Sequence, residues 1–230
     1  MRYAVISDIH SNLDALEAVI AEIPKGTPIL CLGDVVGYGA QPNEVIDVIK
    51  SLRPIVVLMG NHDYAVVTGN VEDFSTYAAV AIMWTRKHIT AENMRFLSKF
   101  HPQARLEIDN IHVALYHASP RDPLFEYIYP NINDEEVDSL IDESKSRIVL
   151  LGHTHIPMRF LPKGNILANP GSVGQPRDGN PNASIGFLTL SAGNCDFEHK
   201  RVKYEVESAA QKIRQAGLPF FLATRLHDGT

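Results

Sequence analysis

Residues 2–10 of the chain read RYAVISDIH, a short apolar run that ends in an aspartate and a histidine two positions apart. The run is rich in Val and Ile, which is typical of a strand buried on both faces of a sheet. Four further apolar runs end in a polar corner in the same way. They are 27–32 before Gly33-Asp34, 55–59 before Gly60-Asn61-His62-Asp63, 111–116 before His117, and 147–151 before Gly152-His153-Thr154-His155. The repetition predicts several strands whose ends carry reactive side chains.

Helical patterns lie between these runs, at 13–23, 42–52, 76–89, 91–100 and 134–143. Asn12, Thr90 and Asn133 stand in front of three of them as candidate N-caps, and Pro42 suits the first position of another. Beyond residue 155 the pattern changes to strands, at 158–161, 166–168, 185–190 and 197–206, with a final helix from about 207 to 216. Strands that alternate with helices, followed by strands alone, predict two sheets flanked by helices.

The composition fits a soluble chain that folds as one domain over residues 1–230. Hydrophobic residues make up 45% and charged residues 21%, and no repeat interrupts the pattern. The formal net charge of −6 argues against bulk binding to nucleic acid. The absence of an apolar run of about 18 residues predicts no membrane span, and the charged start predicts no signal peptide. Two cysteines cannot form a disulfide framework, so we expect a cytoplasmic location.

The polar corners supply seven side chains of the kind that bind metals. The carboxyl ends of strands in open α/β sheets face one edge, so we expect these side chains to converge. Imidazole and carboxylate together favour ions such as Zn²⁺, Fe, Mn²⁺, Co²⁺ or Ni²⁺. Seven donors are too many for one ion and suffice for two if Asp34, alone at its corner, is shared. The candidates are Asp8, His10, Asp34, Asn61, His117, His153 and His155.

Two ions about 3.5–4 Å apart form a clamp for in-line displacement at phosphorus. The leaving oxygen also needs a proton, and His62 lies next to a candidate ligand, with Asp63 placed to orient it. Each motif alone has a purely structural interpretation, such as a capping aspartate, a turn residue or a strand-end histidine. All five occur at strand ends in one chain, which favours the metal site.

The order D-x-H, GD, GNHD, a lone histidine and GHTH resembles the calcineurin-like metallophosphoesterase superfamily. Residues 169–178, NPGSVGQPRD, resemble its small bacterial and archaeal phosphodiesterase branch. The resemblance implies an α/β fold (α+β in some schemes), a four-layer αββα sandwich of two mixed sheets flanked by helices. It also implies a dinuclear centre, with His62 as the catalytic histidine and Asp63 as its acidic partner. One ion is then held by Asp8, His10, Asp34 and His155, and the other by Asp34, Asn61, His117 and His153.

Departures from the superfamily pattern bear on the substrate. Protein phosphatases and symmetrical dinucleoside tetraphosphatases of the superfamily have GD-x-x-x-RG, whereas Tyr38 stands here in place of that arginine. Without an arginine fork for a phosphate dianion, a phosphodiester or polyphosphate is better suited. Arg121, Arg177 and Tyr38 are candidate substrate contacts, with local salt bridges as the alternative for the two arginines.

We therefore expect a metal-dependent phosphoric ester hydrolase, in the first place a phosphodiesterase acting on a small phosphorylated substrate. The resemblance implies attack by a metal-bound hydroxide, with His62 as general acid or phosphate contact. Mn²⁺ is the ion expected first, with Fe, Zn, Co, Ni or Mg as alternatives. A dinucleoside polyphosphate hydrolase is the nearest alternative, and a non-catalytic binding module belongs to another class. The lack of a basic run ranks nucleic acid low, and the apolar segment LPFFLA leaves homo-oligomerisation open.

Overall fold

The computed structural model describes residues 1–191 and 194–230. Ten strands are found in these residues: β1 (Arg2–Ile6), β2 (Ile29–Cys31), β3 (Val56–Val57), β4 (Gln103–Ile108), β5 (Ile111–Tyr116), β6 (Ile148–Leu150), β7 (Met158–Phe160), β8 (Ile166–Asn169), β9 (Ala183–Ser191) and β10 (Asn194–Val202). The helices are α1 (Leu13–Ala21), α2 (Pro42–Leu52), α3 (Asn61–Thr68), α4 (Thr76–His88), α5 (Ala91–Leu97), α6 (Asp134–Ser144), the 3₁₀ turn η1 (Pro162–Gly164), α7 (Val206–Gln215) and α8 (Phe220–Asp228). In the described part of the chain, none of these helices combines the length and apolar character needed to cross a membrane.

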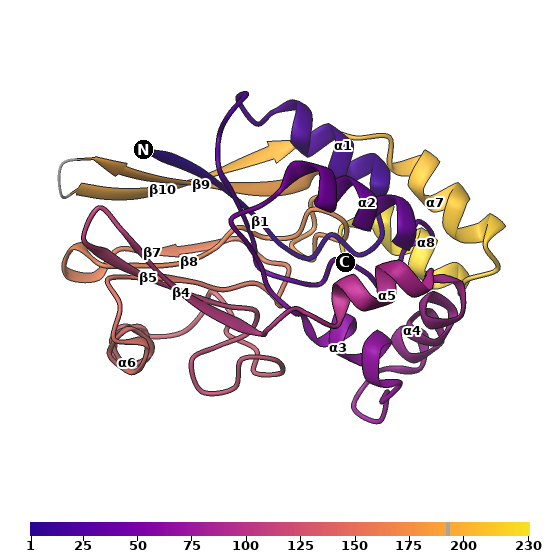
Figure 1. Ribbon diagram of the computed structural model, residues 1–230, viewed down its shortest axis with the longest axis horizontal. Coiled ribbons are helices and arrows are strands. Elements are labelled where there is room, and N and C mark those ends of the chain that lie inside the picture. Colours follow the sequence, from indigo (N-terminus) through magenta and orange to yellow (C-terminus); the bar gives the residue numbers. More distant parts are fainter. Residues whose placement is uncertain (192–193) are drawn as a thin grey trace.

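The strands form two mixed sheets, which lie one above the other in Figure 1. The first has the order β10-β9-β1-β2-β3, in which β1, β2 and β3 are parallel. The second has the order β4-β5-β6-β8-β7, in which β5, β6 and β8 are parallel. The remaining strands pair antiparallel to their neighbours. The expected α/β sandwich of two mixed sheets flanked by helices is confirmed.

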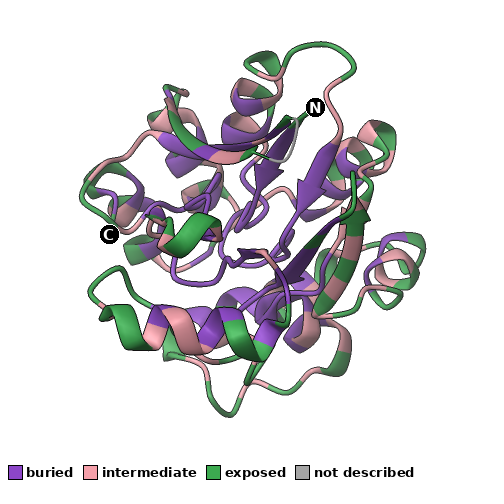
Figure 2. Ribbon diagram, turned by 90° about the vertical axis from the view of Figure 1, so that its left-hand side faces the viewer, coloured by how far each residue is buried: buried purple, intermediate pink, exposed green. Residues whose placement is uncertain are grey.

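Alternating side chains of the central strands place the sheets between layers of helix. On β1, Tyr3 and Val5 pack in the core between the sheets, whereas Ala4 and Ile6 pack with α1 and α2. On β5, Val113 and Leu115 share the core between the sheets, and Ala114 and Tyr116 pack with α6. Figure 2 shows the result as buried strands surrounded by helices with exposed outer faces.

Helix caps follow the sequence closely. The side chains of Asn12, Thr90 and Asn133 accept hydrogen bonds from backbone amides three residues later, at 3.1, 3.1 and 2.9 Å. The three predicted N-caps are confirmed, and Pro42 begins α2 as expected. Each cap satisfies an amide that has no partner inside its helix.

Several elements differ from the sequence-based expectation, among them β4 at residues 103–108, where no strand was predicted. Residues 61–68 form α3 rather than a plain corner, and residues 220–228 form α8 rather than a tail. The last strand ends at Val202 and not at residue 206. In the apolar segment 218–223, Leu218, Leu222 and Ala223 are buried in a cluster with α4 and α7, while Phe220 and Phe221 stay exposed.

Candidate metal centre

Loops at the ends of β1, β2, β3, β5 and β6 bring all seven predicted ligands to one buried place. One group of side chains with ligand atoms within 4.8 Å of each other consists of Asp8, His10, Asp34 and His155. A second group of the same kind consists of Asp34, His117 and His153. Asn61 joins the second group, since its Oδ1 lies 3.2 Å from Nε2 of His117. Asp34 is therefore common to both groups.

The two oxygens of the Asp34 carboxylate have different surroundings. Its Oδ1 accepts a hydrogen bond of 2.9 Å from the backbone amide of His62. Its Oδ2 lies 3.5 Å from Nε2 of His10 and 3.6 Å from Nε2 of His117, so it faces one histidine of each group. Among the described residues this buried Oδ2 has no hydrogen-bond partner. Its position suits an oxygen shared between two ions.

Hydrogen bonds fix the tautomers of three histidines. Nδ1 lies next to a backbone carbonyl in His10 (3.1 Å), His117 (2.9 Å) and His155 (2.6 Å). A carbonyl only accepts, so Nδ1 carries the proton and Nε2 keeps its lone pair for the centre. The Nε2 atoms of His10 and His155 consequently face each other as two acceptors at 3.0 Å. A cation held here would accept both lone pairs and remove the repulsion between them.

Burial shifts the pKa values of several side chains at the centre. Burial lowers the pKa of His10, His153 and His155 well below the usual value, which keeps these side chains neutral. Burial also raises the pKa of Asp8 to about 7. His153 adds a buried Nε2 without a hydrogen-bond partner in the part of the chain that is described. Buried nitrogen and oxygen atoms that have no hydrogen-bond partner are suitable ligand atoms for divalent ions of the first transition row.

The backbone at the centre adopts conformations that L-residues seldom take. Five ligands have positive φ: Asp8 (53°), His10 (51°), Asp34 (51°), His153 (67°) and His155 (62°). Such angles cost free energy and persist where the surrounding structure enforces them. Gly60 is one of the residues that pack closely here, because a Cβ on Gly60 would collide with the Asp34 carboxylate. The loops are thus held in the shape that directs their side chains inward.

Residues 169–178 form hydrogen bonds to two of the loops that carry ligands. The Ser172 hydroxyl donates to the carbonyl of Asp8 at 2.7 Å, and the Asn169 amide donates to the carbonyl of Gly152 at 2.6 Å. The Gln175 carbonyl accepts the Nδ1–H of His155. The stretch therefore fixes the D-x-H and GHTH loops relative to each other.

His62 and Asp63 both lie in the first turn of α3, but their side chains make different contacts. The His62 ring lines a cavity beside the ligands, and its Nδ1 is buried without a partner among the described residues. The Asp63 carboxylate accepts hydrogen bonds from the amides of Val35 (3.2 Å), Val36 (3.0 Å) and Gly60 (3.0 Å). Asp63 thus ties the GD loop to the start of α3, and the described contacts do not join it to the His62 ring.

The cavity beside the centre has a volume of about 370 Å³. Asn61, His62 and His153 form its floor on the metal side, and Tyr38 and Arg177 lie on its wall. Aromatic side chains add to the wall, since the Tyr127 ring lies 4.0 Å from that of His153, centroid to centroid. The complete lining is Tyr38, Asn61, His62, Asp73, Phe74, Ser75, Ala78, Phe125, Tyr127, His153, Arg177 and Arg225.

The three predicted substrate contacts have different surroundings. Tyr38 and Arg177 line the cavity, and an Nη2–H of Arg177 donates to the Tyr38 hydroxyl at 3.2 Å. Arg121 instead binds Glu126 and Glu136, outside the cavity lining. Its guanidinium is occupied by the local ion pairs that were the alternative interpretation.

Sequence reasoning missed Arg225 and Phe74 as cavity residues. Arg225 belongs to α8, whose packing against α4 and α7 brings it to the wall, and Phe74 lies just before α4. Neither residue stands in a ligand motif. One feature of the sequence could have indicated Arg225. Residues 220–228 carry spaced apolar residues typical of a short helix that packs on the domain, and Arg225 is a basic residue within it.

The sandwich of two mixed sheets and the buried His/Asp cluster together define a protein with the fold and metal-binding potential of a metallophosphoesterase. A family model described as the calcineurin-like phosphoesterase superfamily domain matches residues 1–194. The chain belongs to this superfamily.

The chain is also similar over nearly its full length to several known proteins. The chain is 38% identical to the uncharacterized protein MJ0912 of Methanocaldococcus jannaschii, with 98% of this chain and 97% of that protein aligned. The crystal structure of a metallophosphoesterase from Sphaerobacter thermophilus is similar over 100% of both chains, at 33% identity and a TM-score of 0.85. The hypothetical protein PH1004 of Pyrococcus horikoshii shares the fold, with a TM-score of 0.90 at 19% identity over 100% of this chain and 98% of that one.

Proposed function

We propose that the protein is a dinuclear metal-dependent phosphodiesterase that hydrolyses small phosphodiesters. The observation that carries the proposal is the pair of ligand groups that share Asp34 and border a cavity with His62 in its lining. Asp8, His10 and His155 would complete one ion's ligands, and Asn61, His117 and His153 those of the other. When bound, the ions supply Lewis-acid stabilisation of the charge that develops on a phosphoryl oxygen.

The chain's own residues orient the ester and manage its proton. His62 is next to the ligand Asn61 and presents its ring to the cavity, where an N–H can contact the phosphoryl group or protonate the leaving oxygen. Tyr38 packs against His62 with ring centroids 4.4 Å apart and limits the ring's motion. Arg177 adds a positive charge to the wall, which favours an anionic substrate.

Dinucleoside polyphosphates are a second candidate substrate class, favoured by the aromatic wall. Tyr127 is 48% exposed, and its ring stacks on that of Tyr129 with the centroids 5.8 Å apart. Phe125 lines the same cavity. Such faces suit the stacking of a nucleobase, whose ring offers a flat apolar surface.

The test is a grid of metals and substrates. Metal-free protein is loaded with Mn²⁺, Co²⁺, Ni²⁺, Mg²⁺ or Zn²⁺ and assayed on a monoester, bis(p-nitrophenyl) phosphate, a dinucleoside polyphosphate and a phosphopeptide. We expect the diester to be turned over fastest, with at least one transition metal. Full metal occupancy without turnover of any substrate would instead favour a non-catalytic binding module.

The role of His62 is tested with His62→Ala and, as a matched control, His112→Ala at an exposed position on β5. We expect His62→Ala to lower kcat for the diester by about 10²–10⁴-fold with both metals still bound. The control should retain the wild-type kcat. Loss of metal from His62→Ala would contradict the assigned role.

A further inference from the structure

Two arginines from distant parts of the chain meet at one ring. Arg177 follows β8 in the chain and Arg225 comes from α8, and both line the cavity beside the metal centre. Their guanidinium carbons lie 5.7 and 5.8 Å from the centroid of the Tyr38 ring. The same ring lies 4.4 Å from that of His62. Both guanidinium groups and the proposed catalytic histidine therefore lie close to the same tyrosine ring.

Both guanidinium groups keep N–H donors free for a ligand. Arg177 uses Nη2 for Tyr38 and Gln175, and its buried Nε has no partner among the described residues. Arg225 donates from Nε to the backbone oxygen of Thr230, the last residue of the sequence. In the described part of the chain neither arginine pairs with an aspartate or glutamate side chain, and this includes the exposed Asp73 on the same cavity.

Two like charges held together in a partly buried wall are unfavourable without an anion. Burial, and then the charge of Arg177, lowers the pKa of Arg225 to about 10, so Arg225 stays charged near neutral pH and is repelled by Arg177. Stacking on Tyr38 offsets part of this cost. Arginine forks bind phosphate oxygens in pairs, so a phosphate is the ligand that such an arrangement suits best.

We propose that Arg177 and Arg225 bind a second, non-scissile phosphate of the substrate, which makes the natural substrate an ester with two phosphate groups. The proposal rests on the phosphodiesterase function above and adds a residue outside the 1–194 segment that the family model matches. The second phosphate is joined to the scissile one either directly, as in a diphosphate, or through one sugar.

Calorimetric binding to the Mn²⁺-loaded protein tests the pair without turnover. The probes are thymidine 5′-monophosphate, thymidine 5′-diphosphate and thymidine 3′,5′-bisphosphate, and the last two distinguish the two linkages. We expect one two-phosphate probe to bind the wild type at least about 10-fold more tightly than the monophosphate. Arg225→Gln and Arg177→Gln should each reduce that preference to less than about 3-fold.

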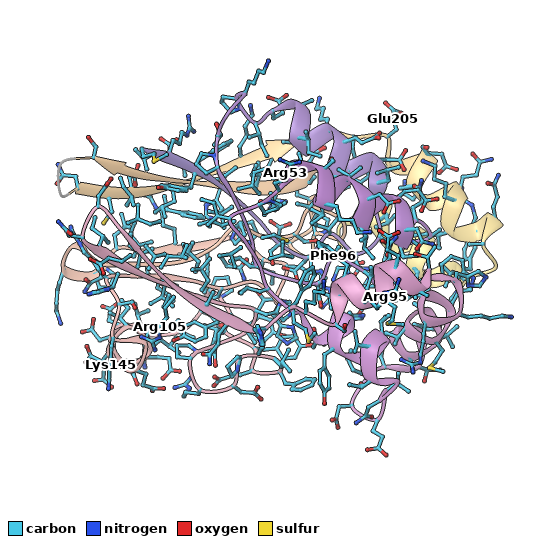
Figure 3. The ribbon with its side chains drawn as sticks, in the orientation of Figure 1. Arg53, Arg95, Phe96, Arg105, Lys145 and Glu205 are labelled. Carbon is cyan, nitrogen blue, oxygen red and sulfur yellow. The ribbon has the colours of Figure 1, made fainter. Side chains whose placement is uncertain are left out.

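Arg95→Gln is the matched control, because Arg95 is exposed on α5 (Figure 3) and lies outside the cavity lining. It should keep the full preference, and melting temperatures verify that each variant is folded. Equal binding of all three probes by the wild type, or a preference that survives in both cavity variants, overturns the proposal. The phosphodiesterase function fails separately, if no metal supports turnover of bis(p-nitrophenyl) phosphate.

Discussion

Individual residues at the metal centre combine strained backbone with buried polar groups. Asp34 illustrates the combination, with a φ of 51°, a buried side chain and one carboxylate oxygen left for a ligand. Each of these features costs free energy in the folded chain. Close contacts with neighbouring backbone, such as that of Gly60 with the Asp34 carboxylate, hold them in place. The centre should therefore be sensitive to the smallest additions of volume.

Gly60→Ala tests this sensitivity. A Cβ on Gly60 would collide with the Asp34 carboxylate, although the φ of −85° at this position suits alanine. We expect a loss of about 1–3 kcal/mol in the free energy of unfolding, together with loss of metal binding. Urea denaturation and metal analysis of the purified protein measure the two effects.

Gly26→Ala is the control for backbone strain alone. Gly26 has a φ of 82° and open space where a Cβ would stand. The variant should lose about 1 kcal/mol and bind metal like the wild type. Equal metal binding by both variants would show that the Asp34 carboxylate tolerates the added methyl group.

Cys31 offers a test of burial in the core next to the centre. Burial raises the pKa of its thiol to about 12, whereas Cys195 is only partly buried. Since the thiolate is the reactive form, we expect Ellman's reagent at pH 8 to label one thiol quickly in the native protein and both in urea. The raised pKa also means that folding stability falls as the pH rises from about 9 towards 12. Fast labelling of two thiols in the native state would contradict this burial.

At the scale of elements, the centre depends on how strand ends and helix starts are tied together. The GD loop after β2 and the start of α3 meet at the Asp63 carboxylate, which accepts three backbone amides. This contact sets the positions of the ligands Asp34 and Asn61 relative to each other. Asp63 is thus proposed as a positioning residue rather than a direct partner of His62.

Asp63→Asn separates these two roles. An amide NH₂ in place of one oxygen would face a backbone N–H, so we expect the free energy of unfolding to fall by about 2–3 kcal/mol and metal affinity to fall with it. Asp47→Asn, at an exposed position of α2, should change neither quantity. A variant with unchanged stability and metal content but a shifted pH profile of kcat would favour the catalytic partnership instead.

The elements that sequence predicts best are those whose signal is local. The strands that end in Asp8, Asp34 and His117 are apolar runs with a polar corner, and both features lie within ten residues. α3 gives no such signal. Its first turn consists of the polar residues 61–63, which are buried at the metal centre, so the helix lacks the apolar periodicity that predicts a buried helix face. α8 is short, and its buried face depends on contacts with α4 and α7.

The same distinction separates the site residues. The ligands stand in short motifs, so their convergence follows from the rule that strand ends share one edge of a sheet. Arg121 and Arg225 carry equal charge in the sequence. The pairing of Arg121 with Glu126, five residues further on, is local, whereas long-range packing alone brings Arg225 to Tyr38. No local pattern indicates the position of Arg225.

At the scale of the whole molecule, the buried acidic side chains of the described residues gather at the metal centre. The chain has a formal net charge of −6, and three of its carboxylates, Asp8, Asp34 and Asp63, are buried at the centre. Burial, followed by the charge of Asp63, raises the pKa of Asp34 well above its usual value. Two divalent ions would neutralise this cluster and couple the two sheets, since the ligands come from strands of both.

The shared position of Asp34 makes a quantitative prediction for metal content and stability. We expect the wild type to bind two ions, His155→Ala to retain one, and Asp34→Asn to bind both ions poorly, because only Asp34 belongs to both ligand groups. Metal at about 100 times its dissociation constant should stabilise the wild type by about 2.7 kcal/mol per site, and raise its melting temperature by at least about 5 °C. Plasma mass spectrometry and thermal melts with and without a chelator measure both quantities, with His112→Ala as the control that should match the wild type. If Asp34→Asn keeps one ion and His155→Ala none, the two groups do not share Asp34 in the way that its free oxygen indicates.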